Sequence, residues 1–266
     1  MIEHLLTPLI SERFLTESRY REGHIRIINA LPKRRILGVH VPEMKRLAKQ
    51  LSKSSDVMKL LQEFKACHAV DPFSLTYEEI VIWGLVIDSV KVSWEVRKSL
   101  LSDYIPVIDN WGVCDTICCN AKWVNDKQQL WEFLLPYWDS CSEFEVRFAV
   151  VMAMVNLLDA EWFPKICLKL DSLKIDSIQS EYISVRKARG MVVPEGKGVA
   201  IGEEPYYVRM AIAWLLATAL AKIPDFTRAY VNSCNLSEDI IRLYKRKARE
   251  SLRTRDVNPL YFYIII

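Results

Sequence analysis

Glycine is scarce in this chain, with 8 residues among 266, roughly 3% where about 7% is usual in globular proteins. Four of them fall within thirteen residues, at Gly190, Gly196, Gly198 and Gly202, so the rest of the chain has almost none. Hairpin-rich β folds and phosphate-binding glycine loops both need glycine at defined positions. The scarcity disfavours both classes and predicts an all-α fold.

The chain also lacks the cysteine spacing of a structural zinc site. None of its seven cysteines lies in a CxxC pair, and Cys114, Cys118 and Cys119 crowd one segment. The four histidines lie far upstream of that segment, at His4, His24, His40 and His68. Structural zinc needs Cys or His ligands at short, regular spacings. We therefore expect no metal ion and no cofactor, and we expect the cysteines to be buried, reduced thiols of a cytosolic protein.

Long hydrophobic runs are missing as well. The longest uncharged apolar run extends from Met210 to Ala221, twelve residues, where a membrane-spanning helix needs about 20. The first residues, MIEHLLTPLISERF, lack the basic start and apolar core of a signal peptide. These features predict a cytoplasmic protein without a membrane segment.

Helix signals recur along the chain. Proline in a first turn predicts a helix over residues 41–51, and Thr76-x-x-Glu79 and Ser142-x-x-Glu145 fit the capping box. The apolar residues follow the helical period and predict roughly twelve to fourteen helices. Four prolines predict breaks between them, at Pro106, Pro136, Pro164 and Pro224.

A pattern of aromatic-x-Val-Arg opens three apolar segments, at 94–97, 144–147 and 206–209. The distance along the chain from the second of these segments to the third shortens to about 45 residues if the glycine-rich segment 186–205 is an inserted, exposed loop. Periods of ~40–47 residues are typical of HEAT repeats, which stack into a solenoid with a concave surface. We expect one such domain over residues 1–266.

Positive charge is concentrated in two places. Residues 242–255 contain seven Lys or Arg and one Glu, although the formal net charge is only +3. A second group contains Arg19, Arg21, Arg26, Lys33, Arg34 and Arg35. Clusters of this kind bind phosphate backbones or are simply solvated helix faces.

The segment Asp109-Asn110-Trp111-Gly112-Val113-Cys114-Asp115 is the strongest candidate for chemistry. Asp109 or Asn110 can cap a helix, and Trp111 and Asp115, four residues apart, then share one face. An aromatic ring beside a carboxylate suits a substrate that is, or becomes, cationic. The alternative is a core tryptophan with Asp115 paired to an arginine.

These segments together resemble the DNA alkylation repair enzymes of the AlkD type. The resemblance rests on NWGVCD at 110–115, LGVHVP at 37–42, FEVRFAVV at 144–151 and YYVRMAIAWLL at 206–216. It spans roughly residues 28–252, apart from the glycine-rich segment. It implies HEAT-like repeats with a concave, basic surface that binds double-stranded DNA. It also implies a DNA glycosylase that hydrolyses the N-glycosidic bond of purines alkylated at N3 or N7.

The resemblance extends to single residues. Trp111 and Asp115 match the family's aromatic residue and catalytic acid, Trp214 its second aromatic wall, and Arg147 an arginine of the following repeat. The chain departs from the family at Asn29, where some members carry tyrosine. For Arg147 the alternative is a contact between repeats, and for Trp214 a core position.

Phosphate contacts are expected from five basic residues: Arg147, Arg209, Arg242, Lys245 and Arg246. Three residues of the glycine-rich segment, Lys187, Arg189 and Lys197, are further candidates. The expected partner is double-stranded DNA with alkylated purines, bound by a monomer. The rival hypothesis is a non-catalytic helical-repeat scaffold that binds nucleic acid or a protein, because solenoids commonly serve as binding scaffolds.

Overall fold

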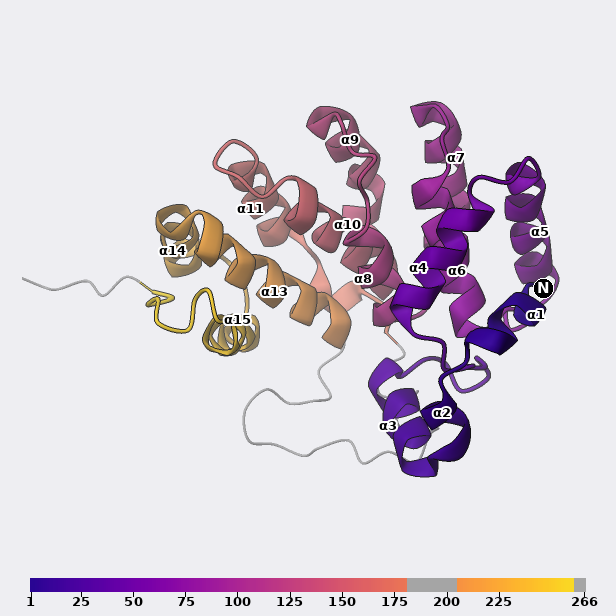
Figure 1. The fold of residues 1–266 in the computed structure, drawn as a ribbon. Coiled ribbons are helices and arrows are strands. Elements are labelled where there is room, and N and C mark those ends of the chain that lie inside the picture. The colour runs from indigo at the N-terminus through magenta and orange to yellow at the C-terminus, as the bar shows by residue number, and fades with distance from the viewer. Residues whose placement is uncertain (181–204, 261–266) are drawn as a thin grey trace, which may run out of the picture. The chain divides into compact units, whose positions relative to one another are not determined.

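The computed structural model describes residues 1–180 and 205–260, and within them every regular element is helical. The first compact unit, Met1–Asn125, contains eight α-helices and two 3₁₀ turns, Thr7–Leu9 and Ile105–Val107 (Figure 1). Its helices are α1 Glu3–Leu6, α2 Glu12–Thr16, α3 Ser18–Ile28, α4 Val41–Leu51, α5 Val57–Val70, α6 Tyr77–Ser89, α7 Trp94–Tyr104 and α8 Trp111–Cys118.

The second unit comprises residues 126–180 and 205–260 of the described chain and contains six more α-helices. These are α9 Lys127–Trp138, α10 Glu143–Asn156, α11 Phe163–Ser172, α13 Tyr206–Lys222, α14 Pro224–Ser233 and α15 Glu238–Glu250. One 3₁₀ turn, Ile175–Ser177, follows α11. The all-α prediction is therefore confirmed for the described residues.

Local signals account for most helix boundaries. The helix predicted at 41–51 is α4, and Thr76 and Glu79 form a complete capping box at the start of α6. Ser142 also precedes a helix, but its side chain makes no capping bond, and Glu145 instead accepts a hydrogen bond from Ser140, 2.7 Å away. The second predicted capping box is thus wrong.

Three of the four prolines lie at helix boundaries or in a 3₁₀ turn, as predicted. Pro136 does not, because it lies inside α9, two residues before the helix ends at Trp138. Proline removes one backbone donor and crowds the carbonyl four residues earlier, yet α9 continues for two residues beyond it. The predicted break at Pro136 is therefore wrong.

The core of the first unit forms around α6, whose residues from Tyr77 to Ile87 are all buried. This helix packs against α4, α5, α7 and α8. Trp83 lies 5.8 Å from the ring of Phe64 on α5 and 5.3 Å from that of Tyr104 on α7. The helix α8, which carries Trp111 and Asp115, is held directly against this core.

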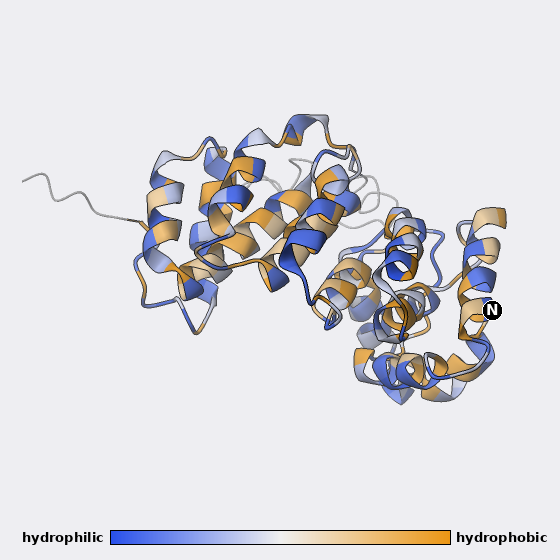
Figure 2. Ribbon diagram, turned by 90° about the horizontal axis from the view of Figure 1, so that it is seen from above, coloured by the Kyte–Doolittle hydropathy of each residue, from blue (hydrophilic) through white to orange (hydrophobic). Residues whose placement is uncertain are grey.

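In the second unit the buried helices are α10 and α13. The helix α13 packs against α10, α14 and α15, and α10 also packs against α9. The outer helix α15 is strongly amphipathic, with Ile240, Leu243 and Tyr244 buried. Figure 2 shows hydrophilic and hydrophobic residues on different sides of such helices.

The arginine of the aromatic-x-Val-Arg pattern has the same structural role in all three places. These arginines, Arg97, Arg147 and Arg209, are all buried. Arg97 donates to the carbonyls of Ile87 and Val90 at the end of α6, and Arg147 donates to the carbonyl of Tyr207, 2.6 Å away. The pattern therefore marks helices whose arginine joins neighbouring elements.

All seven cysteines are free, but only Cys114 and Cys118 are buried. Cys119 and Cys141 are exposed and the other three are half-buried, so the prediction of buried thiols holds for two residues only. Within the described residues, no helix is long and apolar enough to cross a membrane. The candidate DNA contacts Lys187, Arg189 and Lys197, most of the 186–205 segment and the apolar end 261–266 lie outside the described residues.

Candidate functional site

The start of α8 is fixed by Asn110, which resolves the choice between Asp109 and Asn110 as the capping residue. The side-chain oxygen of Asn110 accepts a hydrogen bond from the backbone N–H of Gly112 at 2.7 Å. Its Nδ2 donates to the backbone carbonyl of Ile28 at 2.5 Å. Because Asn110 is buried, this one side chain caps α8 and ties it to the end of α3.

Trp111 and Asp115 lie one turn apart on the accessible side of α8. Both are half-buried, whereas Val113, Cys114, Ile117 and Cys118 on the other side are buried. The indole Nε1 of Trp111 donates to the carbonyl of Ile27 at 3.0 Å. Neither residue is a core residue, and each keeps part of its surface accessible.

Tyr77, the first residue of α6, packs against the first turn of α8. A Cβ atom built on Gly112 would lie 2.7 Å from the Tyr77 hydroxyl oxygen, so a larger residue here would require the Tyr77 side chain to move. Burial raises the pKa of the Tyr77 phenol, and the carboxylates of Glu78, Asp115 and Asp109 raise it further. The phenol therefore stays protonated beside the candidate site.

Asp109 supports α8 from the preceding turn. Its carboxylate accepts two hydrogen bonds from the buried Arg34, at 2.9 and 3.1 Å, and Arg34 also donates to the carbonyls of Pro72 and Leu75. Burial raises the pKa of Asp109, although the Arg34 charge favours its ionised form. Arg34 is thus a structural residue and not part of a phosphate-binding surface.

The second unit carries Trp214 on a different helix. Met210, Trp214 and Thr218 are half-buried and form a stripe along α13, whose other residues from Ala211 to Leu220 are all buried. Trp214 is therefore not a core residue. The sulfur of Met210 lies 3.8 Å from a guanidinium nitrogen of Arg246 on α15, so this stripe adjoins the basic helix.

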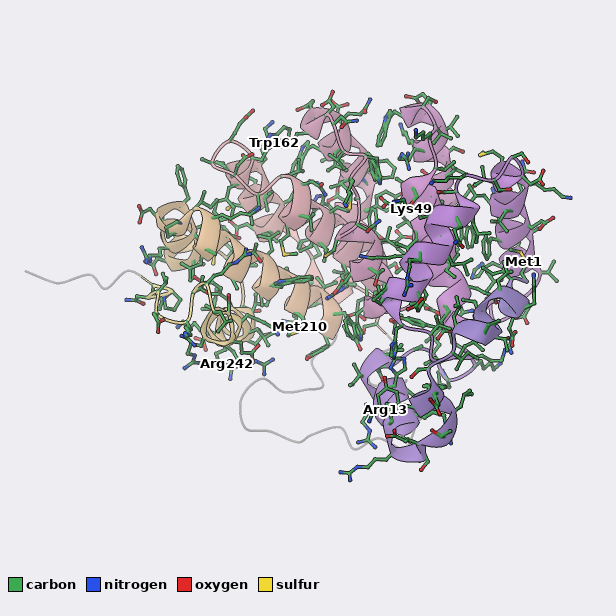
Figure 3. The ribbon with its side chains drawn as sticks, in the orientation of Figure 1. Met1, Arg13, Lys49, Trp162, Met210 and Arg242 are labelled. Atoms are coloured by element: carbon green, nitrogen blue, oxygen red, sulfur yellow. The ribbon has the colours of Figure 1, made fainter. Side chains whose placement is uncertain are left out.

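The accessible side of α15 carries several basic residues. Arg242 and Arg246 are exposed and Lys245 is half-buried. Figure 3 shows Arg242 at the edge of the unit, on the helix next to the one that carries Met210. Of these, Arg246 has an ion pair with Glu250 at 3.6 Å, but both side chains are about half exposed, and such pairs contribute little.

Arg147 and Arg209 are placed differently from the prediction. Arg147 is buried, donates to the Tyr207 carbonyl and lies 5.8 Å from the centre of the Tyr207 ring. Arg209 pairs with Asp239 at 2.8 Å and with Asp176 at 3.3 Å. Both arginines are thus occupied inside the fold, and their expected phosphate contacts are replaced by structural ones.

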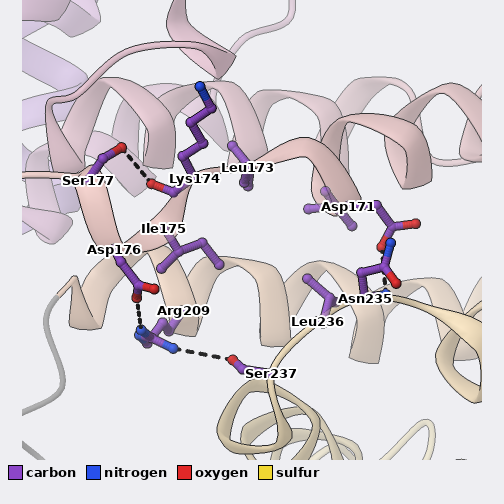
Figure 4. Close-up of a pocket in the computed structure, with 11 residues that line it drawn as sticks. Asp171, Leu173, Lys174, Ile175, Asp176, Ser177, Arg209, Asn235, Leu236 and Ser237 are labelled. Atoms are coloured by element: carbon purple, nitrogen blue, oxygen red, sulfur yellow. Dashed lines mark hydrogen bonds and ion pairs between the residues drawn. The ribbon is translucent and has the colours of Figure 1, made fainter.

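Arg209 also lines a cleft of about 450 Å³. In Figure 4 its guanidinium bridges Asp176 and Ser237, with Asp171, Lys174 and Asn235 along the same cleft. Cations and carboxylates alternate in this lining. The cleft therefore has no dominant charge that would select an anionic or a cationic ligand.

Three features of the site escaped prediction from the sequence. They are the phenol of Tyr77 against Gly112, the Arg34–Asp109 ion pair, and the bonds from α8 to the carbonyls of Ile27 and Ile28. Each joins residues at least 35 positions apart in the chain, so no local spacing indicates them. Only the glycine of Asn-Trp-Gly, unusual inside a helix, gave a signal of close packing.

The predicted residues thus fall into two groups. Trp111 and Asp115 share one face of α8 in the first unit, while Trp214, Arg242, Lys245 and Arg246 belong to α13 and α15 of the second. Comparison of the chain with family models, curated proteins and solved structures finds no match.

Proposed function

We propose that this protein is a DNA glycosylase that hydrolyses the N-glycosidic bond of purines alkylated at N3 or N7. The observation that supports this most directly is that Trp111 and Asp115, both half-buried, lie one turn apart on one side of α8, whose other side is buried. The motif resemblance to the AlkD-type enzymes points to the same chemistry.

The reaction requires few catalytic groups from the protein. A purine alkylated at N7 or N3 already carries positive charge, so it leaves without a strong general acid. As the bond between the sugar C1′ and the base nitrogen breaks, the electron pair goes to the base and positive charge develops on the sugar. The Asp115 carboxylate stabilises that charge. It also orients the attacking water and accepts its proton.

The aromatic residues have a supporting role in this proposal. The face of Trp111 attracts positive charge through its ring quadrupole and offers a flat surface for the deoxyribose. The hydrogen bond from its Nε1 to the Ile27 carbonyl fixes the orientation of the ring. Trp214, half-buried on α13, is the second aromatic surface for the DNA.

Phosphate binding is assigned to basic residues on the accessible side of α15. Arg242, Lys245 and Arg246 extend from a helix whose apolar side is buried against α13, and each phosphate that they neutralise releases condensed counterions. The proposal includes a HEAT-like stacking of the helices with a concave basic surface. The repeated use of a buried arginine to join adjacent elements, at Arg97, Arg147 and Arg209, supports it.

The test is release of base from duplex DNA that contains N7-methylguanine, by the wild type and by Asp115→Asn. We expect the variant to lose release while it keeps DNA binding, measured by fluorescence anisotropy at low salt. Glu95→Gln, which removes an exposed carboxylate on α7 of the same unit, is the matched control and should release base normally.

Two results would contradict the proposal. Release that survives in Asp115→Asn would remove the carboxylate from the chemistry. DNA binding by the wild type without any release would favour the alternative of a non-catalytic scaffold. In that case the loss of Asp115 should change the free energy of unfolding more than any binding property.

A further inference from the structure

One face of α3 has exposed residues near both ends and the half-buried Gly23 between them. Arg19, Gly23, Arg26 and Ile27 recur at intervals of four, three and one residues, which places them on one side of a helix. Arg19 and Arg26 are exposed, and 69% of the Ile27 surface is accessible. We refer to these four residues as the α3 face.

Gly23 is unexplained by the packing of the described chain. It lies in the interior of α3, where glycine costs about 1 kcal/mol relative to alanine. A Cβ atom built on it meets no atom of the described residues within 4 Å, whereas those built on Gly38, Gly84 and Gly112 all clash. The described residues therefore leave room for a larger side chain, and a bare backbone here suits the close approach of another molecule.

The charges on the α3 face suit an anionic molecule. Among the described residues neither Arg19 nor Arg26 has an ion-pair partner. Arg21, on another side of the helix, instead donates to the carbonyls of Phe14 and Leu15 at 3.2 and 3.3 Å. The helix thus has two guanidinium groups without an ion-pair partner among the described residues. They lie next to Gly23, which has no side chain.

The α3 face is also joined to the helix that carries Asp115. The last residues of α3 accept two hydrogen bonds from the start of α8, Ile27 from the Trp111 indole and Ile28 from the Asn110 side chain. The helix ends immediately afterwards at Asn29, which adopts the left-handed conformation with φ 52° and is buried. The exposed Ile27 is therefore held at a fixed position beside Trp111.

We propose that the α3 face is a second DNA-contacting surface, which binds the sugar–phosphate backbone next to the alkylated purine. Arg19 and Arg26 contact phosphates, Gly23 lets the backbone approach the helix closely, and Ile27 packs against a deoxyribose or the edge of the groove. Proteins that bind the minor groove also place apolar side chains against DNA, by inserting them between base steps. This inference rests on the proposed glycosylase function.

Gly23→Leu is the decisive variant, tested in the full chain for binding to the duplex that contains N7-methylguanine. Leucine is the better helix former, so the midpoint of thermal unfolding should stay unchanged or rise. We expect the dissociation constant to increase at least about tenfold, a loss of about 1.4 kcal/mol. Ala66→Leu, which adds the same side chain at an exposed position of α5, is the matched control and should bind as the wild type does.

A second measurement tests the charges. Arg19→Ala and Arg26→Ala should each reduce the slope of log K against log salt concentration by about 1, while Lys59→Ala on α5 should leave it unchanged. If the wild type releases base but Gly23→Leu binds DNA normally, the α3 face is not a DNA surface and the proposed function stands. If the wild type does not bind DNA at all, both proposals fail.

Discussion

The indole nitrogen of Trp111 donates a hydrogen bond to the backbone carbonyl of Ile27, 3.0 Å away. The acceptor belongs to the last turn of α3, whose final carbonyls lack partners within the helix. One side chain thus completes the end of one helix and fixes the start of another. The orientation of the ring beside Asp115 depends on a residue 84 positions earlier in the chain.

Trp111→Phe tests this bond because it keeps an aromatic ring and removes the N–H donor. We expect the free energy of unfolding to fall by about 1 kcal/mol, the net value of one hydrogen bond. Base release should fall further than DNA binding, since the ring is no longer held in one orientation. Urea unfolding and single-turnover release measure the two effects. Unchanged stability would mean that the bond to Ile27 contributes nothing.

Arg209 and Arg246 make a matched pair for separating structural from DNA-binding arginines. Arg209→Met leaves the carboxylate of Asp239 buried without its partner, so we expect the unfolding free energy to fall by about 3 kcal/mol. The salt dependence of DNA binding should not change. For Arg246→Met we expect the reverse. The free energy of unfolding should change by no more than about 0.5 kcal/mol, and the slope of log K for DNA binding against log salt concentration should be reduced by about 1. The same loss of slope in both variants would contradict the structural role of Arg209.

The sequence predicted the helices well because their signals are local. The proline that starts α4 and the capping box of Thr76 and Glu79 act within one turn, and both are present as expected. Ser142 shows the limit of such signals, because the neighbouring Glu143 accepts a hydrogen bond from the backbone N–H of Tyr207, 64 positions later. A distant partner therefore shapes the N-terminal region of α10, and no sequence window shows that partner.

The roles of the arginines were predicted less well for the same reason. Arg34 belongs to a basic cluster in sequence, where charged residues are usually exposed, and Arg147 and Arg209 lie in segments that resemble the AlkD-type enzymes. Each is buried and bound to a carbonyl or carboxylate from another element. The amphipathic pattern of α15, by contrast, placed Arg242 and Arg246 on the exposed side, because a helical period alone determines that side.

Asp88, near the end of α6, predicts a pH dependence of stability. Burial raises the pKa of its carboxyl to about 6, despite hydrogen bonds from the side chains of Asn120 and Trp123, and its Oδ1 has no partner among the described residues. The unfolded value is about 3.9, so the folded state binds the proton more tightly. This stabilisation is complete below about pH 4 and is lost as the pH rises through about 6.

Asp88→Asn removes that titration while its amide oxygen can still accept a hydrogen bond from Asn120 or Trp123. At pH 7.5 we expect the variant to be more stable than the wild type by about 1–3 kcal/mol. At pH 4 the two should be nearly equal. Urea unfolding at both pH values measures the difference. A variant that is less stable at pH 7.5 would show that the ionised carboxylate stabilises the fold.

Gly112 and Tyr77 provide a test of how tightly the candidate catalytic helix is packed. In Gly112→Ala the added methyl group would lie 2.7 Å from the Tyr77 hydroxyl oxygen and 3.0 Å from the side-chain oxygen of Asn110. Overpacking of this kind costs about 1–3 kcal/mol, and the strain acts on the first turn of α8, one turn before Asp115. We therefore expect Gly112→Ala to lose both stability and base release.

Tyr77→Phe removes the oxygen that clashes, and the nearest remaining atom of that ring lies 3.6 Å from the added methyl, an ordinary contact distance. The double variant Gly112→Ala, Tyr77→Phe should therefore recover most of the stability lost by Gly112→Ala alone. A double-mutant cycle by urea unfolding measures this coupling, which should exceed about 1 kcal/mol because the two groups are in contact.

Recovery of base release along with stability would show that the phenol of Tyr77 affects Asp115 through the position of α8. If stability returns and release does not, the phenol itself contributes to the reaction. Additive effects on stability would contradict the packing contact between the two residues.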